Sequence, residues 1–216
     1  MTPMDFQNST DLDSERLERL FVRHTSPYRH DRLQVRVRYS RGSDFSGTCY
    51  YGEARIFINL GRHVVYPYRL GTHIAKSQSN RTHWWRETFR VLVPDACRLA
   101  LFVYLHELYH YLVKASKHNP RRKEAMCDRF AVAALVDHHG CRVVDPHGRP
   151  VARERWDFQD VCAFVAAAPK VPTTLWDIAD VATPCRAGAF TTPREIPVTI
   201  LGTGTDARRP ARKAPA

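Results

Sequence analysis

The sequence predicts an α+β fold in which a small twisted sheet packs against helices. Apolar and polar side chains alternate from Leu33 to Tyr39, a pattern that is typical of a half-buried strand. Residues 50–61 are rich in β-forming side chains and bounded by glycines, which predicts a second strand. Two mostly apolar segments follow. Each begins with a cap and proline pair, at 94–95 and 119–120, that is typical of a helix start.

The N-terminal part of the chain predicts one helix before the first strand. Leu17, Leu20 and Phe21 fall on one face of residues 11–24, behind acidic residues in the first turn, so this helix should pack on the body of the protein. A Gly/Ser-rich loop is expected at 41–48. We therefore assign residues 1–30 to an N-terminal packing helix, 31–168 to the main domain and 169–216 to an irregular, disordered basic tail.

Shorter elements are expected on both sides of the two long helices. Two extended segments, with a polar loop long enough to act as a lid between them, precede the first helix. Gly140 should end the second helix, and a hairpin and an amphipathic helix follow it. The expected ranges are 63–68 and 84–93 for the extended segments, 71–82 for the loop, 141–151 for the hairpin and 156–168 for the helix.

The composition of the 216-residue chain, 44% hydrophobic and 25% charged, is that of one globular domain. No run approaches about 18 apolar residues and no leader pattern opens the chain, so a cytoplasmic location and no membrane span are expected. Six cysteines without a C-x-x-C pair predict reduced thiols, and Cys127 is expected to face the core. The net charge of +11 favours acidic partners, nucleic acid among them, but a generally arginine-rich surface explains it equally well, and the chain has no helix-turn-helix or zinc-finger pattern.

Residues 101–112, L-F-V-Y-L-H-E-L-Y-H-Y-L, place chemically active side chains inside an apolar helix. His106 and His110 are four residues apart, so both imidazoles lie on one helix face and can bind one metal ion. Glu107 lies on the adjacent face, where it could accept a proton from a water at the open coordination position. The pattern H-E-x-x-H therefore predicts a zinc site with Glu107 as general base.

The second long helix offers the third protein ligand that a catalytic zinc site needs. Glu124 and Asp128 share a helix face, so Glu124 can bind the ion while Asp128 accepts the second ring N–H of a ligand histidine. Asp128 as a direct ligand is an open alternative, and so is a third histidine. The histidines in question are His118, His138 and His139. A site of the type H-E-x-x-H-x-x-G-x-x-H is excluded, because Val113 and Ser116 occupy the glycine and histidine positions.

The segment H-E-L-Y-H followed by E-A-M-C-D-R-F-A resembles the gluzincin metallopeptidases, in which H-E-x-x-H precedes E-x-x-x-D. Thermolysin-like enzymes and the small proteases of the ImmA/IrrE group carry related patterns. The resemblance covers roughly Tyr50 to Val136, and its specific part is the two helices. It implies a zincin-like fold and a zinc ion. By this resemblance the ligands are His106, His110 and Glu124, the base is Glu107 and the supporting carboxylate is Asp128.

The function implied by this resemblance is zinc-dependent hydrolysis of a protein or peptide substrate. Residues 54–60 resemble, in position and composition, the strand that lines the zincin cleft, where an extended peptide could add as a further strand. The oxyanion donor stays unassigned among four candidates, which are Tyr109, Tyr111, His73 and His83. Two alternatives are a non-catalytic, metal-stabilised module that binds nucleic acid and a DNA-associated protease of the SprT-like type with a third histidine ligand.

Overall fold

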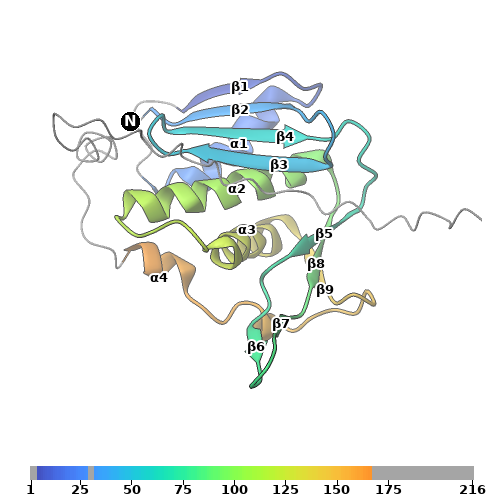
Figure 1. Cartoon of the computed structure of the whole chain (residues 1–216). Coiled ribbons are helices and arrows are strands. Elements are labelled where there is room, and N and C mark those ends of the chain that lie inside the picture. Colours follow the sequence, from blue (N-terminus) through green and yellow to red (C-terminus); the bar gives the residue numbers. More distant parts are fainter. Residues whose placement is uncertain (1–3, 29–31, 167–216) are drawn as a thin grey trace, which may run out of the picture.

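The protein has a mixed α+β fold, and the computed structural model describes residues 4–28 and 32–166 (Figure 1). The expected disordered tail therefore lies outside the described residues. The strands are β1 (Asp5–Asn8), β2 (Gln34–Tyr39), β3 (Phe45–Tyr50), β4 (Arg55–Leu60), β5 (Tyr68–Thr72), β6 (Ser77–Ser79), β7 (Trp84–Arg86), β8 (Phe89–Val93) and β9 (Arg142–Val144). The helices are α1 (Ser14–Thr25), α2 (Ala96–Ala115), α3 (Glu124–His139) and α4 (Val161–Ala166), with a short 3-10 turn at Arg153–Arg155.

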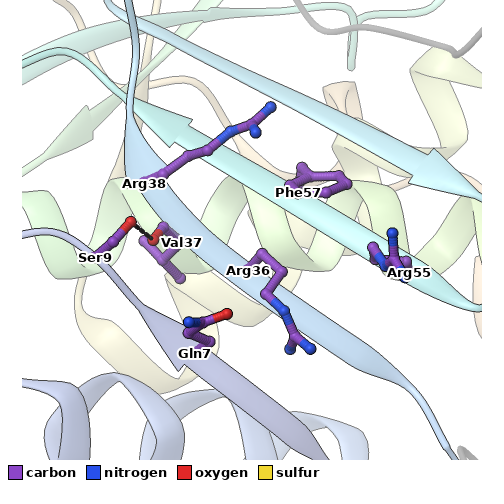
Figure 2. A pocket seen from close by; sticks show the side chains of 7 residues that line it. All are labelled: Gln7, Ser9, Arg36, Val37, Arg38, Arg55 and Phe57. Carbon is purple, nitrogen blue, oxygen red and sulfur yellow. Dashed lines mark hydrogen bonds between the residues drawn. The ribbon is translucent and has the colours of Figure 1, made fainter.

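The largest sheet has the strand order β1-β2-β4-β3 and lies against α2, with α3 on the far side of that helix (Figure 1). Strands β1, β2 and β4 are parallel, whereas β3 runs antiparallel to β4 at one edge. The predicted alternation in β2 is confirmed: Val35 and Val37 are buried while Arg36 and Arg38 face outward. The outward face is a shallow basic hollow in which arginines surround Phe57 (Figure 2).

Two expectations about the sheet were wrong. Residues 41–48 were expected to form a loop, but Phe45–Tyr50 form β3, in which every residue except the last is buried. Because its two faces are covered by different neighbours, F-S-G-T-C-Y lacks the alternation that reveals a half-buried strand. Residues 54–60 were expected to line the cleft, but β4 pairs with β2 on one side and β3 on the other, so β3 is the edge strand instead.

The first long helix begins as predicted. The Asp95 side chain accepts a hydrogen bond from the Arg98 backbone N–H at 2.9 Å, which is an N-cap. Nearly all of α2 is buried, because it packs against the large sheet, α1 and α3. The central helix therefore carries its polar residues in a setting with almost no access to water.

The second long helix begins later than predicted. The Asn119 side chain accepts a hydrogen bond from the Arg121 N–H at 3.0 Å within a turn, and α3 starts only at Glu124, without a side-chain cap. Gly140 ends the helix as predicted, with a φ of +66° in the left-handed region that glycine tolerates. The late start puts Glu124 in the first turn of α3.

The remaining segments agree with the predictions only in part. The range 84–93 is divided between β7, which forms a hairpin with β6, and β8, which joins β5 and β9. Of the range 63–68, only Tyr68 enters a strand. Of the range 156–168, α4 covers Val161–Ala166. The hairpin after Gly140 is confirmed by β9 and its bridge from Val144 to Pro150.

One hydrophobic core includes residues from the N-terminal segment, the large sheet, α2, α3 and α4. Within the described ranges, five cysteines are free thiols, of which Cys162 alone is exposed. Among residues 4–28 and 32–166, no helix combines the length and the hydropathy that a membrane span requires.

Candidate metal centre

The two histidines of α2 face each other on one side of the helix, as their spacing predicts. The Nε2 atoms of His106 and His110 are 3.2 Å apart, and both side chains are buried. In the absence of a metal, the two nitrogens can share one proton in a hydrogen bond. Two imidazole nitrogens converging at this separation can equally well bind a single cation.

Glu124, at the start of α3, approaches both imidazoles. Its Oε2 lies 3.1 Å from the Nε2 of His106, and its Oε1 lies 3.4 Å from the Nε2 of His110. Zinc binds nitrogen and oxygen ligands at roughly 2.0–2.1 Å in a tetrahedron, so two ligand atoms of one ion are separated by about 3.3 Å. The two Nε2 atoms have this spacing, and each lies at a similar distance from one of the two Glu124 oxygens. The donor set and its dimensions therefore fit zinc.

Asp128, one turn further along α3, supports the same site from behind. Its Oδ1 lies 2.8 Å from the Nδ1 of His106, and its Oδ2 accepts a hydrogen bond from the His73 backbone N–H at 2.6 Å. Burial alone would raise the pKa of Asp128, but the hydrogen bonds from His106 and His73 lower it to about 2. A carboxylate that is ionised at this position fixes the orientation of the His106 ring.

The charges between α2 and α3 compensate one another in the metal-free protein. Burial opposes a charged His106, but hydrogen bonds to Asp128 and Glu124 outweigh it and raise the pKa of this histidine to about 10. Burial similarly opposes ionisation of Glu124, yet hydrogen bonds from His106 and His110 hold its pKa well below the usual range. Binding of a metal through the His106 Nε2 would therefore release a proton.

Glu107 lies on another side of α2, against the edge strand β3, and is completely buried. A Cβ atom built on Gly47 would come within 2.5 Å of Glu107 Oε1 and within 2.8 Å of a Val103 methyl carbon. Only glycine leaves room for the carboxylate at this point of β3. Neither Glu107 oxygen has a hydrogen bond of normal geometry among the described residues. Burial raises the pKa of Glu107 to about 8, against the opposing effects of His106 and the Cys49 backbone amide.

The three histidines considered as alternative third ligands have other neighbours and do not contact the pair of His106 and His110. The His118 ring stacks on Phe164, with 4.5 Å between the ring centroids. His138 and His139 lie at the opposite end of α3 and contact His24. Of the alternatives weighed from sequence, Asp128 alone touches the histidine pair, through a ring nitrogen that would face away from the ion.

Cys127 is a neighbour that the sequence reasoning set aside. Its buried thiol lies within 4.8 Å of the ligand atoms of both His106 and His110. Cys127 is buried as expected, but the expectation that it points away from the face of Glu124 and Asp128 was wrong, because its thiol faces the histidine pair. The signal was present in the spacing, because residues three apart, such as Glu124 and Cys127, are neighbours on a helix surface.

The structure narrows the search for an oxyanion donor. The Tyr109 hydroxyl donates to the Val161 carbonyl oxygen, and the His83 ring contacts Thr82 at the tip of the β6–β7 hairpin. His73 remains beside the site: its Nδ1 lies 3.4 Å from Asp128 Oδ2, and the ring is largely exposed. The hydrogen bond to Asp128 raises the pKa of His73, although burial acts in the opposite direction.

Tyr51 is a second residue that the sequence reasoning missed. Its hydroxyl is buried and has no hydrogen-bond partner among the described residues. Burial raises the pKa of Tyr51, and so do Cys49 and the nearby carboxylates of Glu107 and Glu124. The residue lies in the turn after β3, inside a range that was expected to be one continuous strand, so no pattern in the sequence marked it.

The comparisons with protein-family models, with curated proteins and with solved structures found no match. The class that the observations define is therefore an α+β protein with a candidate metal centre built between two helices. Its activity has to be argued from the site itself.

Proposed function

We propose that the protein is a zinc-dependent peptidase with a zincin-like arrangement of metal helix, second ligand helix and edge strand. The observation that carries this proposal is the spacing of 3.1 to 3.4 Å among the Nε2 atoms of His106 and His110 and the carboxylate of Glu124. These three side chains would hold the ion. Zinc, when bound, supplies a water activated at neutral pH and polarises the carbonyl of the scissile bond.

Glu107 is the general base in this proposal. Its carboxylate has a pKa raised to about 8, so it can accept a proton at one Oε atom and later donate it to the leaving amine. His73 is a candidate for stabilising negative charge on the substrate oxygen, because its raised pKa favours the cation and its ring is exposed beside the ligands.

The edge strand β3 supplies a binding mode for an extended peptide. Its outer edge is not paired with another strand among the described residues, and Gly47 lies directly against Glu107. A peptide that adds to β3 through main-chain hydrogen bonds would run past the general base. This mode recognises the backbone, so it favours unfolded or extended protein segments as substrates.

A second candidate function rests on Cys127. If its thiolate joins both histidines and Glu124, the ion has four protein ligands and no open position, which is the composition of a structural site. The protein would then be a non-catalytic module whose two helices are held together by metal. The isolated, buried carboxylate of Glu107 argues for the catalytic alternative, because a structural site gains nothing from an uncompensated acid.

Metal content and proteolysis, measured on the same samples, test the proposal. Glu107→Gln should bind one equivalent of zinc per chain but lose at least about a thousandfold in the cleavage of an unfolded protein such as casein. Glu124→Ala should lose both zinc and activity. Glu18→Gln and Glu18→Ala, at an exposed glutamate of α1, are the matched controls. Full activity in Glu107→Gln would refute the peptidase.

Cobalt substitution distinguishes the open site from the closed one. Cobalt(II) bound to a thiolate absorbs strongly in the near ultraviolet, and this band is absent from a site with only nitrogen and oxygen ligands. For the peptidase we expect the cobalt protein to lack the band and Cys127→Ser to retain zinc. A thiolate band that disappears in Cys127→Ser, in a protein without proteolysis, would establish the structural site instead.

A further inference from the structure

The β6–β7 hairpin exposes two tryptophans. Trp84 is 65% exposed and Trp85 is 43% exposed, although indole is among the side chains that gain most from burial. Figure 1 shows the hairpin projecting from the body on the side away from the large sheet. Neighbouring exposed aromatic side chains can form an apolar patch, and such patches mark interaction sites on protein surfaces.

Hydrogen bonds give the hairpin a defined shape. The Asn80 side chain accepts hydrogen bonds from the backbone N–H groups of Thr82 and His83, which fixes the turn. At the base, Arg86 donates to the His73 carbonyl oxygen at 3.1 Å and to the Ser77 hydroxyl at 2.9 Å. The tryptophans are therefore presented on a fixed ribbon and not on a loose loop.

The charge of this segment has one sign. Residues 69–86 contain four Lys and Arg residues and no Asp or Glu. No ion pair among the described residues involves Lys76, Arg81 or Arg86. Trp84 and Arg86 lie two residues apart on the same face of the ribbon, with the guanidinium 5.5 Å from the indole ring.

A buried arginine beneath an exposed aromatic ring adjoins the hairpin. The Arg129 guanidinium lies 4.2 Å from the ring of Phe158, which is 43% exposed, and Arg129 bonds to the carbonyl of Ile74 at the root of the hairpin. Because Arg129 is only 5% exposed, this region combines the exposed rings of Phe158 and Trp84 with the cations of the hairpin itself. This is the composition of surfaces that stack nucleobases and neutralise phosphates.

The outer face of the large sheet is a weaker candidate for an anionic ligand. Three arginines surround Phe57 there (Figure 2), but Arg36 pairs with Asp5 and Arg55 pairs with Glu53. Most of its positive charge is therefore compensated within the protein. The hairpin cations have no such partners.

We infer that the Trp84 face of the β6–β7 hairpin is a binding site for single-stranded nucleic acid, with bases stacked on Trp84 and phosphates bound by Lys76, Arg81 and Arg86. A single strand fits better than a duplex, because an indole ring needs an unpaired base with an open face. The inference does not depend on the peptidase proposal, and Glu107→Gln should bind nucleic acid as the unaltered chain does.

Fluorescence anisotropy of a labelled oligothymidylate of about 12 nucleotides, titrated with the full chain, tests this inference. Trp84→Ala should weaken binding about tenfold, whereas Trp84→Phe should stay within about threefold because the ring is retained. Val65→Ala removes exposed apolar surface elsewhere and should have no effect. Arg81→Ala should weaken binding and reduce its salt dependence more than Arg19→Ala, which removes the same charge from α1.

Other ligands of the Trp84 face, such as duplex DNA or an anionic membrane, predict different results. A duplex of the same sequence should bind more weakly and respond little to Trp84→Ala. Unchanged oligothymidylate binding by Trp84→Ala would overturn the inference. So would equal losses on single strand and duplex, or binding to phosphatidylserine vesicles with none to the oligonucleotide. Circular dichroism of each variant, compared with the unaltered chain, excludes unfolding as the cause of a loss.

Discussion

Helix α2 carries buried polar side chains on two sides, one facing α3 and one facing β3, and the two sides differ in how their charges are balanced. Toward α3, the candidate ligands are paired with one another: His106 contacts both Asp128 and Glu124, and His110 contacts Glu124, although its Nδ1 has no partner among the described residues. Toward β3, Glu107 lies against the backbone of Gly47 without a paired cation or a hydrogen bond of normal geometry, and only the Cys49 backbone amide and the more distant His106 oppose the rise of its pKa. The two sides are adjacent on one helix and share the same buried environment.

This difference shows which part of the site stabilises the fold and which part costs stability. Paired and hydrogen-bonded charges can offset their loss of hydration, and a metal can replace the shared protons without exposing any group. An isolated buried carboxylate has no such compensation, so its pKa rises. Perturbed groups of this kind gather at functional sites. The comparison yields three predictions, beginning with the largest expected effect.

Gly47→Ala should slow catalysis while leaving the metal in place. The new Cβ would lie 2.5 Å from Glu107 Oε1, so the carboxylate has to move, and a displacement of this size costs about a hundredfold in rate. Zinc content should not change, because the α3 side of the helix is not touched. Gly52→Ala is the control, since a Cβ there meets nothing within 4 Å. Equal activity of the two variants would show that the β3 contact does not position Glu107.

Asp128→Asn should weaken zinc binding by about 10- to 100-fold, because the amide removes the charge that orients the His106 ring and favours its ligand form. The change is nearly isosteric, so the packing of α3 should persist. Competition with a chromophoric chelator measures the affinity. Asp137→Asn, at an exposed carboxylate of the same helix, is the control. An unaltered affinity would mean that the ring is held by packing alone.

The isolated carboxylate should also make the stability of the zinc-free protein depend on pH. The pKa of Glu107 is about 8 in the folded state and 4.5 in the reference state, so the folded protein binds an extra proton between these values. The contribution of Glu107 to the free energy of unfolding is then fully present below about pH 4.5. It falls as pH rises toward 8, by at most about 1.4 kcal/mol per pH unit. Urea unfolding in chelator should show a flatter profile for Glu107→Gln. Parallel profiles would contradict the isolation of this group.

The sequence predicted the features of this site that follow from spacing within one helix. Four residues separate His106 from His110 and Glu124 from Asp128, and these pairs share helix faces in the structure. The N-cap Asp95 and the C-terminal Gly140 were likewise readable from local chemistry. The α+β class followed from the same local patterns.

Features that depend on contacts between distant segments were not predictable in this way. The edge strand β3 lacks alternation because its neighbours bury both faces, and nothing in F-S-G-T-C-Y shows that Gly47 lies against Glu107. Tyr51 was hidden for the same reason. Asn119 looked like a helix cap, but its side chain bonds within a turn, and α3 begins only at Glu124, after Arg122 with a φ of 59°.

The two oxygens of Asp128 serve different segments of the chain. One oxygen contacts the ring of His106, and the other accepts the backbone N–H of His73, whose carbonyl oxygen in turn binds Arg86 at the base of the tryptophan hairpin. Three contacts in series thus join the base of a projecting ribbon to His106, a ligand of the candidate metal centre. The path from the tryptophan hairpin to the candidate metal centre therefore runs through polar contacts and not through apolar packing.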